Sequence, residues 1–168
     1  MAADPSELLD VVRFLSDPNG PTPPTDAHLR KAVSSAYYAL FHTVLRAAAE
    51  RFMGPGQERS PAYTILYRSF DHGEMRRVCE AIKASTLSGK YQDALGRTVL
   101  GTDIREFAAL FPLLQDARHT ADYDPRARFV VSDVATLLRE VERAIEAFHA
   151  APPAERTDVL ALLMVRAR

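Results

Sequence analysis

The sequence predicts an all-α protein, an up-and-down helical bundle of four to five core helices with short terminal helices. Two long stretches, starting at Leu29 and at Val130, repeat apolar residues at the three- and four-residue steps of one helix face. No stretch alternates apolar and polar residues over the length of a strand, and no internal repeat is present. With 168 residues, 47% of them hydrophobic, the chain suffices for one domain with a real core.

The first expected helix extends from about Ser6 to Ser16 and carries leucine and valine on one side. The segment D-P-N-G-P-T-P-P-T follows, and its proline and glycine content predicts a turn-rich connector. Residues 1–27 are therefore grouped as an N-terminal helix and a Pro-rich connector. We expect neither this segment nor the other terminal segment to be essential to the core.

The longest helix is expected from Leu29 to Phe52, about 25 residues or roughly 37 Å, and should be the central strut of the bundle. Thr25 or Asp26 can cap its start, and Gly54-Pro55-Gly56 ends it. Its inward stripe is expected to consist of Tyr37, Leu40, Phe41 and Val44.

Two further helices are expected, one around 73–85 and one from Thr102 to about Tyr123. Pro112 interrupts the second, because proline lacks a backbone N–H and crowds the preceding turn. We therefore expect either a kink at Pro112 or a fresh helix with this proline in its first turn.

The other long core helix is expected from Val130 to Phe148, with Ser132 or Asp133 as cap candidates and Pro152-Pro153 as its end. A short helix at 155–165 completes the chain. These limits divide the sequence into a bundle at 28–150 and a short C-terminal helical segment at 151–168.

The bulk charge and the cysteine content exclude several classes of protein. A net charge of −1 gives no general attraction to nucleic acid or to membrane surfaces, so any anion site must be local. The single cysteine, Cys79, lies in an apolar series, which predicts a buried thiol and fits a reducing, cytoplasmic location. Because the N-terminus lacks a basic region before an apolar run, and no 18 consecutive residues are apolar, export and membrane association are disfavoured.

The stretch A-R-H-T-A-D-Y-D-P at 117–125 gathers charged and aromatic groups near the end of a helix. Helical spacing places Arg118 over Asp122 and His119 over Tyr123, each pair four residues apart. Arg118 can hold a phosphate by a planar two-pronged contact, or it can pair with Asp122 and brace the bundle. The residues alone leave both interpretations open.

A second stretch, A-V-S-S-A-Y-Y-A-L-F-H at 32–42, places Tyr38 and His42 one turn apart on the flank opposite the inward stripe. In one interpretation Tyr38 packs under a peripheral helix and His42 is a hydrogen-bonded boundary histidine. In the other, this second face lines a cleft or a subunit contact, where tyrosine, histidine and arginine are common.

The combination of A-Y-Y-A-L-F-H with L-Q-D-A-R-H-T-A-D-Y-D-P resembles the HEPN superfamily, in particular bacterial members with Y-Y-A-x-F-H and R-x-x-A-D-Y motifs, over about residues 28–150. The resemblance implies a four- or five-helix bundle that commonly dimerises, with a polar site near the dimer contact. Many members are metal-independent ribonucleases, whose signature is an arginine followed by Asn, Asp or His and then a histidine five to seven positions after the arginine. Arg118 and His119 match its start, but Tyr123 stands where the histidine is expected.

This departure matters for proton transfer during RNA cleavage. A histidine with a pKa near ~6.5 can accept or donate a proton at neutral pH, whereas a tyrosine near ~10 is mostly a protonated donor. Tyr123 can therefore bond a phosphate without being a competent base. His119 or His42 would have to take the missing role.

Other chemical signals are weak. Arg143 and His149 match the bare arginine–histidine spacing, but we interpret this match as a coincidence within a core helix. His72, in F-D-H-G, is expected to cap or turn the chain at a helix start. The sequence has no H-E-x-x-H, no close cysteine pair and no glycine-rich phosphate loop, so we expect no metal and no cofactor.

The sequence therefore favours a homodimeric, HEPN-like binding or accessory module for RNA, a nucleotide or a protein partner. The alternative is a metal-independent ribonuclease of a toxin–antitoxin or defence system, which would make a nucleotidyltransferase or an antitoxin the natural partner. A third interpretation is purely structural, with Arg118 and Asp122 as a brace. The binding residues would be Tyr38, His42, Arg118, Asp122 and Tyr123; in a nuclease, the catalytic residues would be Arg118, His119 and Tyr123.

Overall fold

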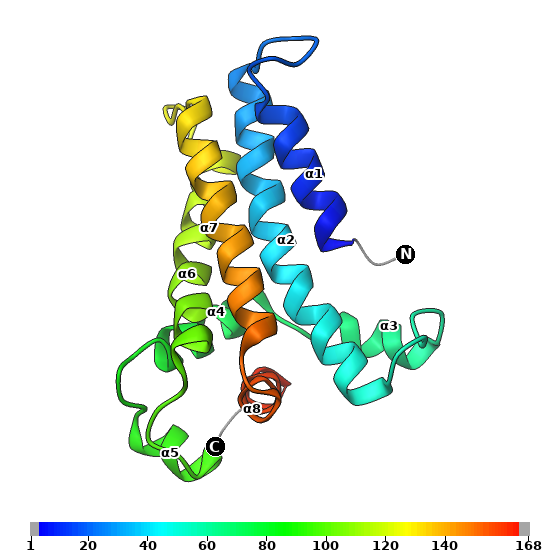
Figure 1. The fold of residues 1–168 in the computed structure, drawn as a ribbon, viewed down its shortest axis with the longest axis vertical. Helices are drawn as coiled ribbons and strands as arrows, with labels where there is room; N and C mark the ends of the chain where they lie inside the picture. The colour runs from blue at the N-terminus through cyan, green and yellow to red at the C-terminus, as the bar shows by residue number, and fades with distance from the viewer. Residues whose placement is uncertain (1–3, 165–168) are drawn as a thin grey trace.

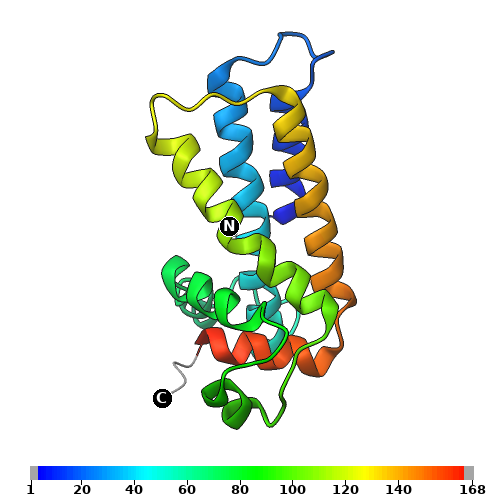
Figure 2. The ribbon, with the colours of Figure 1, turned by 90° about the vertical axis from the view of Figure 1, so that its left-hand side faces the viewer.

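The computed structural model describes residues 4–164, and within this range every regular element is a helix (Figure 1). The predicted all-α bundle is confirmed. Four helices lie alongside one another: α1 (Pro5–Ser16), α2 (Asp26–Met53), α6 (Thr102–Tyr123) and α7 (Val131–Ala150). The shorter helices gather at one end of the bundle (Figure 2): α3 (Pro61–Tyr67), α4 (His72–Ile82), α5 (Gly89–Leu95) and α8 (Pro153–Met164).

The four long helices alternate in direction. Helices α1 and α6 run toward the end that carries the connectors 17–25 and 124–130, and α2 and α7 run back from it (Figure 1). The segment with α3, α4 and α5 crosses the opposite end between α2 and α6. Because of this order, the start of α2 and the end of α6 lie at the same end of the molecule.

Helix α2 is the predicted central strut, and it packs against α1, α3, α6, α7 and α8. Its cap is Thr25, whose side chain accepts a hydrogen bond from the His28 backbone N–H while the His28 ring accepts one from Thr25 N. It ends at Gly54, where φ is +83°, a conformation that favours glycine. The predicted start and end of this helix are confirmed.

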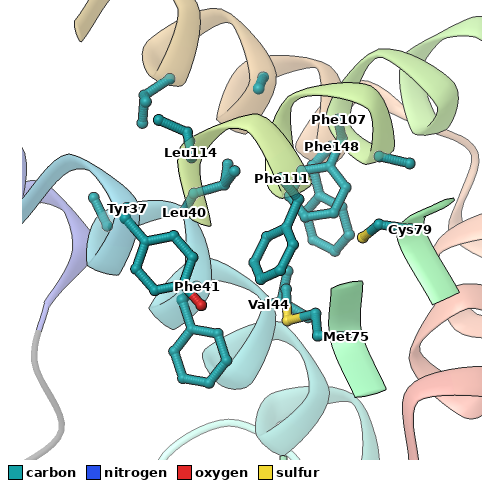
Figure 3. Close-up of a cluster of buried hydrophobic side chains, with 14 of the residues drawn as sticks. Tyr37, Leu40, Phe41, Val44, Met75, Cys79, Phe107, Phe111, Leu114 and Phe148 are labelled. Carbon is teal, nitrogen blue, oxygen red and sulfur yellow. The ribbon is translucent and has the colours of Figure 1, made fainter. Parts of the chain in front are cut away.

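The core lies between α2, α4, α6 and α7 (Figure 3). The predicted inward stripe of α2 is buried, and Cys79 is a buried thiol whose pKa is raised by its burial. The side chains labelled in the close-up are Tyr37, Leu40, Phe41, Val44, Met75, Cys79, Phe107, Phe111, Leu114 and Phe148.

Both terminal helices contribute to this core, contrary to the expectation that neither is essential to it. Val12 of α1 and Val159 of α8 are fully buried, beside one buried leucine on α1 and three on α8. A twelve-residue helix is only marginally stable alone, so its apolar side is stabilised by packing against the bundle. Within residues 4–164, no helix is both long enough and apolar enough to cross a membrane.

Some local predictions need correction. Helix α6 continues through the buried Pro112, so no fresh helix begins there. Helix α7 starts at least two residues earlier than its expected caps allow, with Val130 as the cap residue and Asp133 in the first turn. The sequence interpretation also missed α3 and α5, since seven residues are too few to establish a helical period.

Candidate functional site

The candidate site is centred on Arg118, near the end of α6. Its Nε lies 2.8 Å from Asp122 Oδ2, and its Nη2 donates a hydrogen bond of 3.1 Å to the Tyr38 hydroxyl on α2. The predicted pairing of Arg118 with Asp122 is therefore confirmed. About a quarter of the Arg118 side chain is exposed, while its Nε, beside Asp122, is buried.

Aromatic rings surround the same guanidinium. Its central carbon lies 5.6 Å from the ring centre of Tyr38, 5.8 Å from that of Tyr123 and 6.0 Å from that of Tyr37. Contacts at this range are attractive because the face of each ring is electron-rich. The two motif-bearing helices are thus joined by one arginine and tyrosines from both of them.

A buried serine completes the link between these helices. Ser34 Oγ donates a hydrogen bond to Asp122 Oδ1, while the other oxygen of Asp122 faces Arg118. Ser34 lies one turn before Tyr38 on α2, a spacing that was visible in the sequence, but the sequence interpretation missed it. Asp122 therefore both neutralises Arg118 and fixes the end of α6 against α2.

His72 lies behind these tyrosines, and the sequence interpretation had favoured a cap or turn role for it over a site role. It is the first residue of α4, but the capping side chain belongs to Asp71, which accepts from Glu74 N. The His72 Nδ1 atom lies 2.6 Å from the Tyr37 hydroxyl, and its ring stacks on Phe41 at 4.0 Å. Burial lowers the pKa of His72, and the nearby positive charge of Arg118 lowers it further.

His42 takes part in a neighbouring pair rather than in the arginine contacts. Its Nδ1 lies 2.6 Å from the hydroxyl of Tyr67 on α3, and the two rings stack. Burial is the main cause that lowers the pKa of His42, and burial also raises the pKa of Tyr67 to about 12. This geometry fits the boundary interpretation of His42, although the His42 ring also lies 6.1 Å from that of Tyr38.

The outer side of the site is formed by the exposed part of the motif. His119 and Tyr123 place their rings 4.9 Å apart, and 64% of Tyr123 is exposed. A shallow hollow of about 490 Å³ adjoins these rings, lined by His119, Thr120, Tyr123, Asp124, Pro125 and Arg126. A planar group can therefore stack on Tyr123 while an anion approaches the arginine behind it.

Proton transfer is less well supported by this arrangement. The two histidines beside the tyrosines already share their Nδ1 atoms with Tyr37 and Tyr67. His119 contacts Tyr123, which leaves it on the outer side of the site. Among residues 4–164, no three His, Cys, Asp or Glu side chains converge as metal ligands would.

Comparisons with protein-family models, curated proteins and solved structures give no match to this chain. The two motifs in α2 and α6 therefore have to be interpreted from their own geometry, in which Tyr38 of one bonds to Arg118 of the other. The second arginine–histidine match does not form such a pair. Arg143 is 76% exposed and faces Glu106, whereas His149 lines a separate cavity.

Proposed function

We propose that this chain is an HEPN-like helical binding module, and that it binds single-stranded RNA at the end of α6. The observation that carries the proposal is the partly exposed Arg118 side chain, whose guanidinium is held near tyrosine rings beside the exposed Tyr123. An arginine next to an uncovered aromatic ring is the combination that single-stranded nucleic acid requires. The cation contacts a phosphate, and the ring stacks on a base.

The paired aspartate predicts modest rather than tight binding. Asp122 offsets most of the Arg118 charge, so a phosphate has to compete with a carboxylate 2.8 Å from Nε. His119 and Arg126 line the hollow next to Tyr123 and add local donors. We expect an affinity that weakens strongly with salt, because the contacts with the phosphate are electrostatic.

A metal-independent ribonuclease is the second candidate function, and His72 is the observation that favours it. This histidine lies beside Tyr37 and Tyr38, close enough to Arg118 for its pKa to be lowered by that charge. A lowered pKa keeps the ring neutral, as a general base requires. Its Nδ1 is shared with the Tyr37 hydroxyl, so a role in cleavage would fall to its other nitrogen.

The proposal includes a homodimer, which the resemblance implies for the motif-bearing bundle. A nucleotidyltransferase or an antitoxin would be the partner if the ribonuclease is correct. Light scattering at micromolar concentration distinguishes a chain of 18.6 kDa from a dimer of twice that mass. A monomer at every concentration would remove the dimer from the proposal.

The RNA-binding proposal is tested by fluorescence anisotropy with a labelled single-stranded RNA in low salt and EDTA. We expect Arg118→Gln and Tyr123→Ala each to weaken binding by roughly tenfold, since one stacked base contributes about 1–3 kcal/mol. Arg139→Gln is the matched control, because Arg139 lies on α7 and donates only to Thr136 Oγ1. Wild-type affinity in both site variants would overturn the proposal.

Gel analysis of the same samples distinguishes the two candidate functions. Intact RNA supports a binding module. Cleavage in EDTA that is lost in Arg118→Ala and His119→Ala would establish the ribonuclease as the motif interpretation describes it. Cleavage lost in His72→Gln but retained in His119→Ala would assign the proton transfer to α4 instead.

A further inference from the structure

A second and larger cavity lies away from the end of α6. It measures about 650 Å³ and is formed by the start of α1, the second half of α2 and the junction between α7 and α8. Its volume lies within the range of about 300–1,000 Å³ that is usual for small-molecule sites. None of its lining residues belongs to the candidate site described above.

The lining of this cavity divides into an apolar part and a charged part. Leu9, Ile145 and Leu160 come from three different helices and supply apolar surface, with Ala47 of α2 beside them. The charged part holds three arginines, Arg46, Arg51 and Arg156, and two carboxylates, Asp4 and Glu50. A ligand that fills the cavity would therefore meet an apolar surface and a group of guanidinium ions.

The three arginines differ in how their charges are compensated. Arg46 is paired with Glu50 at 2.8 Å and with Asp4 at 3.3 Å. Arg51 instead donates to the hydroxyl of Thr157 at 2.9 Å, a neutral acceptor.

Arg156 likewise donates to a neutral group, the backbone carbonyl of His149, at 2.7 Å. Among residues 4–164, neither Arg51 nor Arg156 has a carboxylate within ion-pair distance. Two permanent positive charges are therefore held at this cavity by neutral partners, while its two carboxylates both pair with Arg46.

The surroundings of His149 are consistent with a positive local potential. Burial is the main cause that lowers the pKa of His149; the charges of Arg156 and Arg46 lower it further, and that of Glu50 raises it. A neutral imidazole adds no charge of its own and leaves the two arginines as the principal cations. An anion that enters the cavity would replace water around both guanidiniums, in surroundings where charge interactions are stronger than in bulk solvent.

We propose that this cavity binds a small organic anion that carries one oxyanion head on an apolar body. The head would lie between Arg51 and Arg156, because a guanidinium matches the geometry of a phosphate or carboxylate. The body would lie on the apolar surface of Leu9, Ile145 and Leu160. This ligand is distinct from RNA, and its site stands whether or not the end of α6 binds RNA.

Isothermal titration of octyl phosphate into the full chain, in a buffer free of phosphate, tests this proposal. We expect saturable 1:1 binding, at least tenfold weaker in Arg51→Gln and in Arg156→Gln. Arg139→Gln is the matched control, because Arg139 also donates to a threonine hydroxyl, at 3.0 Å, but lies outside the cavity; its affinity should stay within twofold. Octanoate in a parallel titration shows whether a phosphate or a carboxylate head is preferred.

Three further titrations test the proposal, with a cavity-filling variant, with inorganic phosphate and with octanol. Ala47→Phe should abolish binding by filling the cavity without removing a charge, and circular dichroism checks that it folds. Inorganic phosphate should bind much more weakly than octyl phosphate, because it lacks the apolar body. The proposal would be overturned if the arginine variants and Ala47→Phe bound octyl phosphate as the wild type does. Octanol binding as tightly as octyl phosphate, or no binding of octyl phosphate at millimolar concentration, would also overturn it.

Discussion

Arg30 and Arg118 lie at the same end of the bundle and are paired alike, but their remaining donors have different partners. Each forms an ion pair with an aspartate one turn away, Arg30 with Asp26 at 2.7 Å and Arg118 with Asp122 at 2.8 Å. Their exposure is similar, at 18% and 25% of the side chain. Burial therefore does not distinguish a structural arginine from one that is available to a ligand.

The type of partner does distinguish them. The terminal nitrogens of Arg30 donate only to backbone carbonyls at and after the end of α6, those of Ala121, Asp124 and Ala127. Arg118 donates instead to a tyrosine hydroxyl, although both guanidiniums lie near aromatic rings, that of Arg30 at 6.0 Å from the ring centre of Phe129. Carbonyls left by a helix end and a connector need donors, so Arg30 is committed to the fold. The partners of Arg118 are side chains, and their polar groups can form hydrogen bonds to water instead.

The largest effect is expected from Arg30→Ala, which removes the donor to all three carbonyls. Hydrogen bonds to charged groups contribute about 1.5–3 kcal/mol each, and water can replace part of them, so we expect a loss of roughly 3 kcal/mol in the free energy of unfolding. Urea unfolding followed by circular dichroism measures this loss.

Arg118→Ala is the matched comparison for this variant, and it should cost only about 1 kcal/mol because its ion pair is partly exposed. Arg30→Lys should recover little, since one ammonium lacks the fork that reaches several carbonyls. Equal losses for Arg30→Ala and Arg118→Ala would show that the two arginines have the same structural role.

Two half-buried histidines, His42 and His72, predict a dependence on pH. Partial burial is the main cause that lowers the pKa of each below the ordinary value of 6.5; the charge of His72 is a further cause for His42, and the charge of Arg118 is a further cause for His72. The unfolded chain then takes up protons at a pH where the folded chain does not. The free energy of unfolding should therefore fall as the pH decreases from 7 through 6.5, down to the folded-state pKa values.

Urea midpoints at several pH values between 7.5 and 5.5 measure this dependence. The carboxylates whose pKa is lowered in the fold, such as Asp116, affect stability only at more acidic pH. A double variant, His42→Gln with His72→Gln, should reduce the slope, and the part that remains is expected from His149, whose pKa is also lowered. The same slope in the double variant and the wild type would assign the pH dependence to other groups.

The sequence was sufficient for the parts of the molecule that depend on local spacing. Apolar periodicity located the long helices, and the spacing of four residues gave the pairing of Arg118 with Asp122. The contact between Arg118 and Tyr38 depends on how α6 crosses α2. No local pattern encodes that crossing.

The residues that the sequence interpretation missed have their partners far away in the chain. His72 meets Tyr37 across 35 positions of sequence, and α4, which carries His72, is held in place by packing against α6 and α8. Arg30 binds carbonyls more than 90 positions away, and their directions are set by the turn after α6. The cavity of Arg51 and Arg156 is likewise formed by three separate segments, so residue type gave no signal for it.

The smallest effect on stability, and the sharpest test of the contrast between the arginines, is expected from Asp122→Asn. The amide keeps an oxygen for Ser34 but removes the charge that offsets Arg118, so the cost in unfolding free energy should be below about 1 kcal/mol. If Arg118 receives a phosphate, the uncompensated guanidinium should bind single-stranded RNA several-fold more tightly at low salt. Asp116→Asn is the matched control. Asp116 lies on α6, as Asp122 does, but it is paired with Arg76 of α4 and lies outside the site. Unchanged RNA affinity together with a stability loss as large as that of Arg118→Ala would mean that Asp122 and Arg118 act only as a brace between α6 and α2.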